Sequence, residues 1–253
     1  AISSQNPEII YVATGDADGS SFFGCYSLGI IKSTDKGQTW EILPTGIEYS
    51  QGSFISKLLL HPENDSILYA ATSNAIIKTS NGGKHWDVLI DRFNFRDICF
   101  KPNDYNVIYA TTYSINDGAF LFKSEDGGNS WFIANRWKDA SRVKLATTPL
   151  ESLRLLALCV NKYTSSFGGL YLSDSEGYFW ETLLEDTAQY SFLVQAQGFF
   201  NLVLEFFPQS RDEFFIGGVW LYRGKLRSNK FIEISKETHV DMHDIKCNPH
   251  DGK

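Results

Sequence analysis

Short apolar runs, rich in β-branched and aromatic residues, recur along the whole chain between clusters of Gly, Pro, Asn and Asp. One complete unit consists of the runs 54–62, 67–72, 75–78 and 87–90. Such runs are typical of β-strands, and no stretch keeps a helical period long enough to compete. The pattern therefore predicts an all-β chain with four short strands in each unit.

A polar motif, S/T-x-D/N-x-G-x-x-W, follows the third run of four units, and its tryptophans lie 46, 45 and 49 residues apart. Such a period indicates a repeat architecture. The third residue can accept hydrogen bonds from its own turn, the glycine supplies a positive φ, and the tryptophan packs over the hairpin. The fourth copy has Ser175 in place of the acidic residue, which a turn tolerates and a repeated catalytic carboxylate does not. We therefore expect a structural role for Asp35, Trp40, Asn81, Trp86, Asp126, Trp131 and Trp180.

Four antiparallel strands in about 45 residues, repeated, describe the blades of a β-propeller around a central channel. The units are predicted at 1–50, 51–95, 96–140, 141–198 and 199–238, with the start of a further unit at 239–253. Because the chain begins and ends within a unit, we interpret it as about five blades of a larger ring. The alternative, in which the two ends complete one shared blade and close a five-bladed ring, remains open.

Charge and composition exclude some partners. The net charge of −7 and the absence of a Lys/Arg cluster argue against nucleic acid and anionic membranes, since both require a basic face. No segment of the sequence reaches the apolar length of a membrane span. The four cysteines lack a metal-type C-x-x-C pairing, so we expect buried free thiols, with one disulfide as the alternative.

With these motifs in place, the chain resembles the Asp-box (BNR-repeat) β-propellers, which include sialidases, sortilin-type receptor domains and xyloglucan hydrolases. The residues that carry the resemblance are 10–19, 33–40, 215–220 and 239–244. It is most similar to the large secreted repeat proteins of Bacteroidota that the type 9 system exports. The resemblance implies a propeller, a secreted or cell-surface location and further domains in a longer chain. It does not imply an activity, because the group includes enzymes and receptors.

Two polar segments are expected at the channel mouth, where the loops of a propeller converge. In the first, Asp16 and Asp18 could bind Ca²⁺ through oxygen ligands or could simply form turns. In the second, alternation along a strand places His239, Asp241 and His243 on one side. These three could ligate a transition metal, form a structural hydrogen-bond network or perform acid–base chemistry.

Aromatic residues on the longer loops could stack on sugar rings or could belong to the core. They are Tyr49, Phe93, Phe95, Trp137, Tyr163, Phe167, Tyr190 and Phe192. We include Tyr190 among the ligand-binding candidates because it lies in the long, mixed loop 186–200.

The preferred hypothesis is a non-catalytic recognition module that binds a glycan or an extracellular protein through the loops at the channel mouth. Its ligand-binding candidates are Asp16, Asp18, His239, Asp241, His243 and Tyr190. The alternative is a polysaccharide-acting glycoside hydrolase, which needs a pair of carboxyl groups. For that pair the candidates are Asp16 or Asp18 with Asp241. Neither hypothesis requires a cofactor, although Ca²⁺ or a transition metal has possible ligands. A sialidase is disfavoured because the arginines are scattered and no Arg-Ile-Pro segment occurs.

Overall fold

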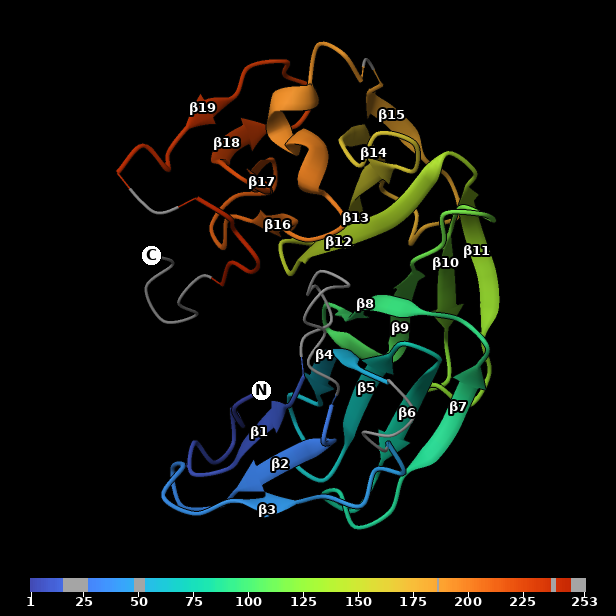
Figure 1. Cartoon of the computed structure of the whole chain (residues 1–253), viewed down its shortest axis with the longest axis vertical. Helices are drawn as coiled ribbons and strands as arrows, with labels where there is room; N and C mark the ends of the chain where they lie inside the picture. Colours follow the sequence, from blue (N-terminus) through green and yellow to red (C-terminus); the bar gives the residue numbers. More distant parts are fainter. Residues whose placement is uncertain (16–26, 48–52, 186, 238–239, 247–253) are drawn as a thin grey trace.

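The residues that the structure describes form five antiparallel sheets. The computed structural model describes residues 1–15, 27–47, 53–185, 187–237 and 240–246. One sheet has three strands and four have four strands, and in each of them strands that are consecutive in sequence pair with one another. The sheets are arranged as blades around a central axis in an open arc (Figure 1). The prediction of an all-β chain of propeller-type blades that form part of a ring is therefore confirmed.

The first three blades cover the N-terminal half of the chain. Blade 1 is β1 (Ile10–Ala13), β2 (Ile30–Ser33) and β3 (Glu41–Ile42); blade 2 is β4 (Ile55–Leu60), β5 (Leu68–Thr72), β6 (Ala75–Thr79) and β7 (Asp87–Asp91); blade 3 is β8 (Phe95–Lys101), β9 (Asp104–Thr112), β10 (Ala119–Ser124) and β11 (Phe132–Trp137). Blade 1 differs from the four-stranded expectation. Its innermost position holds only an isolated bridge between Ile2 and Ile10.

Two blades and a short helical connection follow. Blade 4 is β12 (Ala140–Thr148), β13 (Glu151–Asn161), β14 (Phe167–Ser173) and β15 (Glu181–Leu184); blade 5 is β16 (Val203–Phe206), β17 (Glu213–Gly217), β18 (Leu221–Lys225) and β19 (Ile232–Glu233). The 3-10 turns η2 (Ser191–Leu193) and η3 (Gln195–Gln197) lie in the connection between them. Within the described ranges, no helix has the length and apolar character needed to cross a lipid bilayer.

The first strand of each complete blade lies nearest the axis, and β4, β8, β12 and β16 follow one another around it (Figure 1). The second strands are covered by neighbouring blades on both faces. All five residues of β5 are buried, as is the run from Arg154 to Val160 in β13. Burial on both faces explains why these strands are continuous apolar runs instead of alternating ones.

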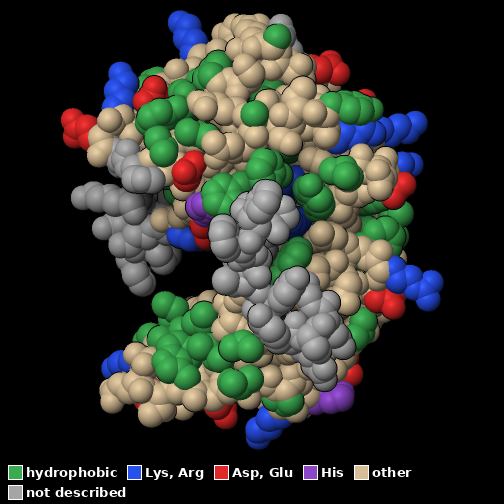
Figure 2. All heavy atoms as spheres, in the orientation of Figure 1, with side chains coloured by type: hydrophobic (Ala, Val, Ile, Leu, Met, Phe, Trp, Pro, Cys, Tyr) green, Lys and Arg blue, Asp and Glu red, His purple; other side chains and the backbone are tan. Residues whose placement is uncertain are grey.

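Among the described residues, blade 1 at one end of the arc exposes apolar side chains. Figure 2 shows hydrophobic side chains gathered over the sheet of blade 1. Ile2, Val12 and Ile42 are among the exposed residues of this blade. The described blades therefore stop short of a closed ring, and the five-bladed closure is not observed in the described ranges.

The first repeated turn, residues 33–40, is closed by side-chain hydrogen bonds. Asp35 accepts bonds from the Ser33 hydroxyl (2.7 Å), the Thr39 N–H (2.9 Å) and the Thr39 hydroxyl (2.6 Å). The Ser33 hydroxyl oxygen in turn accepts from the Gly37 N–H, and the indole N–H of Trp40 donates to the Gly37 carbonyl (3.0 Å). The Thr39 hydroxyl is the largest of the causes that lower the pKa of Asp35 to about 2. The carboxylate is thus a structural acceptor.

The later copies repeat this arrangement. Asn81 accepts from the N–H of His85 (3.0 Å), and Asp126 accepts from the N–H and hydroxyl of Ser130 (2.9 and 2.6 Å). In each copy the tryptophan indole donates to the carbonyl of the motif glycine: Trp86 to Gly83, Trp131 to Gly128 and Trp180 to Gly177. The same turn chemistry therefore operates in all four copies.

The second and third turns are also held by the preceding blade. Lys32 of blade 1 donates to the Gly82 carbonyl (3.0 Å), and Lys78 of blade 2 donates to the Gly127 carbonyl (2.8 Å), which also accepts from the Tyr69 hydroxyl (2.8 Å). We call this contact, a lysine reaching the fourth residue of the next repeated turn, the interblade latch. It joins blades that are adjacent in sequence through a partly buried turn carbonyl.

The latch changes at blade 4 and stops after it. Lys123 of blade 3 meets the side chain of Glu176 (3.0 Å), which stands where the second and third turns have Gly82 and Gly127. Lys101 binds the same carboxylate (2.6 Å). In blade 4 the lysine position is occupied by Leu172. Blade 5 carries no repeated turn that could receive a latch.

Candidate functional site

A buried carboxylate joins three blades at the axis. Asp97 of β8 accepts hydrogen bonds from Lys57 Nζ of β4 (2.5 Å) and from the backbone N–H of Leu145 in β12 (3.0 Å). Lys144 Nζ lies 3.9 Å from the same carboxylate. The Asp97 side chain is 1% exposed, whereas those of Lys57 and Lys144 are 24% and 13% exposed. This axial cluster of Lys57, Asp97 and Lys144 fixes the inner strands of blades 2, 3 and 4 relative to one another.

The charges of the axial cluster are set by its geometry. Burial alone raises the pKa of Asp97, but the ammonium groups of Lys144 and Lys57 and the hydrogen bonds outweigh it and hold this pKa well below its usual range. Burial also lowers the pKa of Lys144, whereas the direct contact with Asp97 raises the pKa of Lys57. Asp97 is therefore ionised at neutral pH and fully engaged, so it cannot serve as a general acid.

The described part of the channel mouth contains one of the predicted carboxylates. Asp241 Oδ1 accepts a hydrogen bond from Asn201 Nδ2 (2.7 Å), which also contacts Gln197 Oε1 (3.3 Å). The backbone N–H of Asp241 donates to the Val219 carbonyl (3.0 Å), so its segment is pinned to the loop between β17 and β18. Asp241 has a φ of 76°, in the left-handed region that a non-glycine residue adopts at a cost. These contacts fix the position of the carboxylate.

Asn201 supplies a further polar atom at this place. It is fully buried, and its Oδ1 has no hydrogen-bond partner among the residues that the structure describes. A buried acceptor without a partner is costly in a folded protein.

The segment beside Asp241 is held by an arginine. Arg142 Nη1 donates to the carbonyls of Phe199 (3.0 Å), Phe200 (3.3 Å) and Gly198 (3.4 Å). The ring of Phe200 packs edge-on against His243, with centroids 4.5 Å apart. Asp241 and His243 therefore both lie against the 198–201 segment, although each contacts a different residue of it.

Several predicted site residues lie outside the described residues. They are Asp16, Asp18, Tyr49 and His239. The calcium loop and the three-ligand metal site accordingly stay predictions. Among the residues that the structure describes, no three His, Cys, Asp or Glu side chains are grouped so that they could hold a metal ion.

Tyr190 lies in a different place from the other candidates. It is 7% exposed and packs against Phe167 (5.9 Å between centroids) and Phe231 (6.1 Å), within the core between blades 4 and 5. It also lines a pocket of about 540 Å³ at the outer side of that boundary. Its ring therefore serves mainly as core, because the 186–200 connection folds back over the two blades.

The remaining aromatic candidates fall into buried residues and exposed residues. Phe95 and Phe167 are buried, and Phe93 packs against Phe122 with centroids 4.8 Å apart. Tyr163, in the loop between β13 and β14, is exposed. Phe192, in η2, is also exposed, so Tyr163 and Phe192 have surface that a sugar ring could reach.

Sequence analysis missed the axial cluster and the interblade latch. The latch has a sequence signal, because lysine directly precedes the motif at residues 32, 78 and 123 and leucine does so at 172. The axial cluster has no such signal, since its members are separated by 40 residues or more along the chain.

Comparisons with known proteins agree with the fold. No protein-family model and no curated protein sequence matches the chain. Among solved structures, an ancestral GH74 enzyme superposes with a TM-score of 0.72 over 100% of this chain, at 16% identity. The GH74 xyloglucanase from Xanthomonas campestris superposes with a TM-score of 0.68 over 99% of this chain, at 14% identity. At these identities the likeness shows the fold, which is that of these glycoside hydrolases. The chain spans 33% and 42% of the lengths of the two enzymes.

Proposed function

We propose that this chain is part of the propeller of a polysaccharide-acting glycoside hydrolase that works at the channel mouth. The observation that carries the proposal is the superposition of the whole chain on two glycoside hydrolases, one of them a xyloglucanase. The mouth adds a positioned carboxylate, Asp241, beside a buried and unsatisfied acceptor on Asn201. This weighs against the non-catalytic module that the sequence alone favoured.

Asp241 is the carboxylate that we assign to catalysis. Hydrolysis of a glycosidic bond requires two carboxyl groups, about 5–5.5 Å apart in retaining enzymes and about 6.5–9.5 Å apart in inverting ones. Asp97 is excluded because it is buried and its oxygens accept hydrogen bonds from Lys57 and from the Leu145 N–H, so a substrate cannot reach it. The second group in this proposal is Asp16 or Asp18, which follow β1 in the sequence and lie outside the described residues. The hydrogen bond from Asn201 holds the Asp241 carboxylate in one orientation for catalysis.

The finer assignments follow from the same proposal. The side-chain bonds within the repeated turns support an Asp-box propeller, in which the turns are structural. A polysaccharide substrate supports a secreted or cell-surface location, because such polymers lie outside the cell. Export by the type 9 system and further domains in a longer chain remain predictions from the resemblance.

The test measures new reducing ends after the intact protein is incubated with xyloglucan and with other plant and microbial polysaccharides. We expect release from at least one polymer, and Asp241→Asn should lower kcat/KM by about 10²- to 10⁴-fold, the range for loss of an acid–base group. Asp87→Asn, on the exposed strand β7, is the matched control and should retain full turnover. Absence of release from every polymer, or full turnover in Asp241→Asn, would contradict the proposal.

A second candidate function is glycan recognition without hydrolysis. Tyr163 and Phe199, on neighbouring loops of blade 4 and the 186–200 connection, expose aromatic rings on which sugars could stack. The same incubation separates the two functions, because a recognition module would retain the polymer and release no reducing ends.

A further inference from the structure

The boundary between blades 4 and 5 is built differently from the others. Blade 4 has Leu172 in place of the latch lysine, and blade 5 lacks a repeated turn that would fill the space. Two adjoining pockets remain there, of about 540 Å³ and about 400 Å³, and Glu181 lines both. We call them together the rim groove. Volumes of this size fall in the range of ligand sites.

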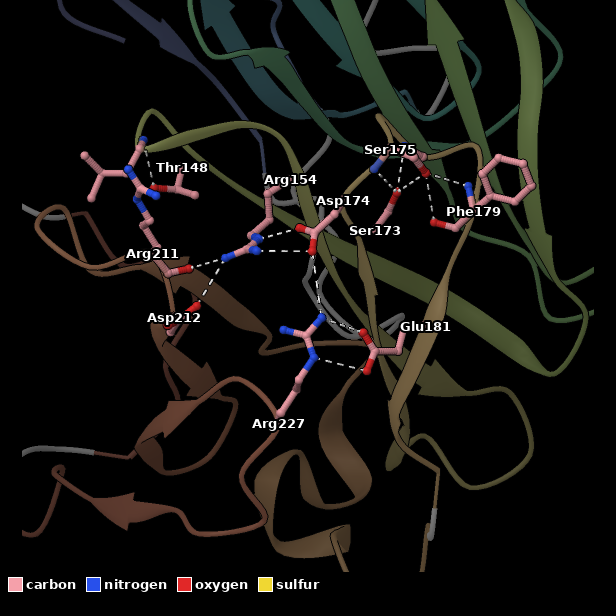
Figure 3. Close-up of polar contacts among 12 residues, drawn as sticks. Thr148, Arg154, Ser173, Asp174, Ser175, Phe179, Glu181, Arg211, Asp212 and Arg227 are labelled. Carbon is pink, nitrogen blue, oxygen red and sulfur yellow. Dashed lines mark hydrogen bonds and ion pairs between the residues drawn. The ribbon is translucent and has the colours of Figure 1, made fainter.

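An arginine clamp replaces the latch at this boundary (Figure 3). Arg154 of β13 binds Asp174 through two bonds, from Nε (2.6 Å) and Nη2 (3.1 Å). Its Nη1 donates to the Arg211 carbonyl (2.8 Å) and to Asp212 (3.2 Å) on blade 5. The two blades are therefore fixed to each other without filling the rim groove.

A second arginine pair lies along the groove. Arg227, in the hairpin between β18 and β19, binds both carboxylate oxygens of Glu181 (2.8 and 3.3 Å) and lies 3.8 Å from Asp174 (Figure 3). The side chains of Asp174, Glu181 and Arg227 are each about half exposed. The groove thus offers hydrogen-bond donors and acceptors whose charges are already balanced.

The fourth turn places an aromatic ring at the end of this groove. Phe179 occupies the position of Thr39, His85 and Ser130 in the other copies, and its side chain is 79% exposed. Its backbone is fixed, since its N–H donates to the Ser175 hydroxyl (2.9 Å) and its carbonyl accepts from that hydroxyl (3.3 Å).

The residues on either side of Phe179 are also held. The Tyr178 hydroxyl donates to Glu125 (2.7 Å), and Trp180 packs edge-on against Trp137 with centroids 5.1 Å apart. Phe179 is therefore an exposed ring on a rigid support, which lowers the entropic cost of binding.

The geometry points to the rim groove as a binding site for a neutral polysaccharide chain. An exposed aromatic face stacks on the apolar face of a pyranose ring, and paired carboxylate and guanidinium groups hydrogen-bond to its hydroxyls. The balanced charges disfavour an ionic ligand, and the partly buried Leu183 in the lining offers apolar surface to the carbon face of a sugar. This site is separate from the channel mouth, so it goes beyond the proposed hydrolytic function.

The test uses hydrogen exchange of the intact Asp241→Asn protein, in which turnover does not consume the ligand. Xyloglucan oligosaccharides and cellohexaose are the probes. We expect saturable slowing of exchange in residues 174–184, and Phe179→Ala should raise the half-saturating concentration by about five-fold or more. Phe132→Ala, which removes a partly exposed ring from β11, is the matched control and should change it by less than about two-fold.

Phe179→Ala is expected to fold, because the turn bonds of residue 179 come from its backbone. The inference is overturned if neither probe slows exchange in 174–184, or if Phe179→Ala and Phe132→Ala respond alike. Slowed exchange in 174–184 without release of reducing ends would contradict the proposed hydrolytic function but not the rim-groove binding site. Release of reducing ends without slowed exchange in 174–184 would contradict the rim-groove binding site but not the proposed hydrolytic function.

Discussion

Replacing Asp97 with asparagine tests whether the axial cluster holds the arc together. The Asn side chain keeps the shape but removes the charge that faces Lys57 and Lys144. It has one acceptor oxygen in place of two, so either Lys57 Nζ or the Leu145 N–H faces an NH₂ group that cannot accept a hydrogen bond. Removing one partner of a buried ion pair costs about 3–5 kcal/mol. Because both lysines keep some contact with water, we expect the lower end, about 3 kcal/mol of unfolding free energy.

This loss is large compared with the usual stability of a domain, which is about 5–15 kcal/mol. Urea unfolding at pH 7, followed by tryptophan fluorescence, measures it directly from the midpoint and slope. In a thermal scan the same change corresponds to a fall in Tm of about 6–12 °C for a chain of this size.

The pH dependence of the difference identifies the ionised carboxylate as its source. The pKa of Asp97 is lowered in the folded state, so its contribution is present above the unfolded value of about 3.9 and is lost as the pH falls below it. The gap in stability between the native protein and Asp97→Asn should therefore narrow between about pH 4.5 and pH 2.

Asp91→Asn is the matched control, because that side chain is exposed on β7. It should change the unfolding free energy by less than about 0.5 kcal/mol. A loss below about 1 kcal/mol for Asp97→Asn, or a gap that stays constant down to pH 2, would refute the reasoning about the axial cluster.

Two further predictions concern the turns. Asp126 should titrate in carbon-detected NMR with a pKa of about 2. Ser130→Ala should raise this pKa, because the hydrogen bond from the Ser130 hydroxyl is the largest cause of its lowering. An unchanged pKa in Ser130→Ala would contradict this explanation. Gly118→Ala should destabilise the protein by about 1–3 kcal/mol more than Gly46→Ala. Both glycines have positive φ, but a Cβ on Gly118 would lie 2.5 Å from the Trp137 carbonyl oxygen, whereas a Cβ on Gly46 would face open space. If the two variants lose the same unfolding free energy in urea, the steric argument is contradicted.

Strands and turns could be predicted because their causes are local. The runs 67–72, 75–78 and 87–90 correspond to β5, β6 and β7 within one residue at each end. The motif fixes each hairpin through bonds between residues two to four positions apart, as in Asp35 with Ser33 and Thr39. Such bonds depend only on the spacing of residues in the sequence. Because the motif occurs four times with the same spacing, the turn could be predicted.

The axial cluster could not be predicted because its cause is not local. Lys57, Asp97 and Lys144 each occupy a strand position that is compatible with solvent exposure when its own sequence is considered. Only the arrangement of blades 2, 3 and 4 around the axis brings the three charges together. The mouth is similar, since Asn201 reaches Asp241 across 40 residues and gives no signal in either segment.

The rim groove was hidden for a different reason. The fourth motif has Ser175 in place of Asp or Asn. From the sequence alone, this substitution indicates only a degenerate structural turn and not a binding site. The exposure of Phe179 and the half-exposed pair of Glu181 and Arg227 become visible only when blade 5 is placed beside blade 4.

The interblade latch makes the middle units of this chain interchangeable modules. Unit 2 carries both halves of the latch, because Lys78 donates to the next turn and Gly82 accepts from the preceding blade, so a duplicated unit 2 would keep the latch at every junction. Deleting unit 2 would instead remove Lys57 from the axial cluster. Units 4 and 5 lack this freedom, because the Arg154 clamp matches only Asp174 and Asp212. An ancestral array could therefore lengthen through its middle, while the pair that frames the rim groove had to be inherited together.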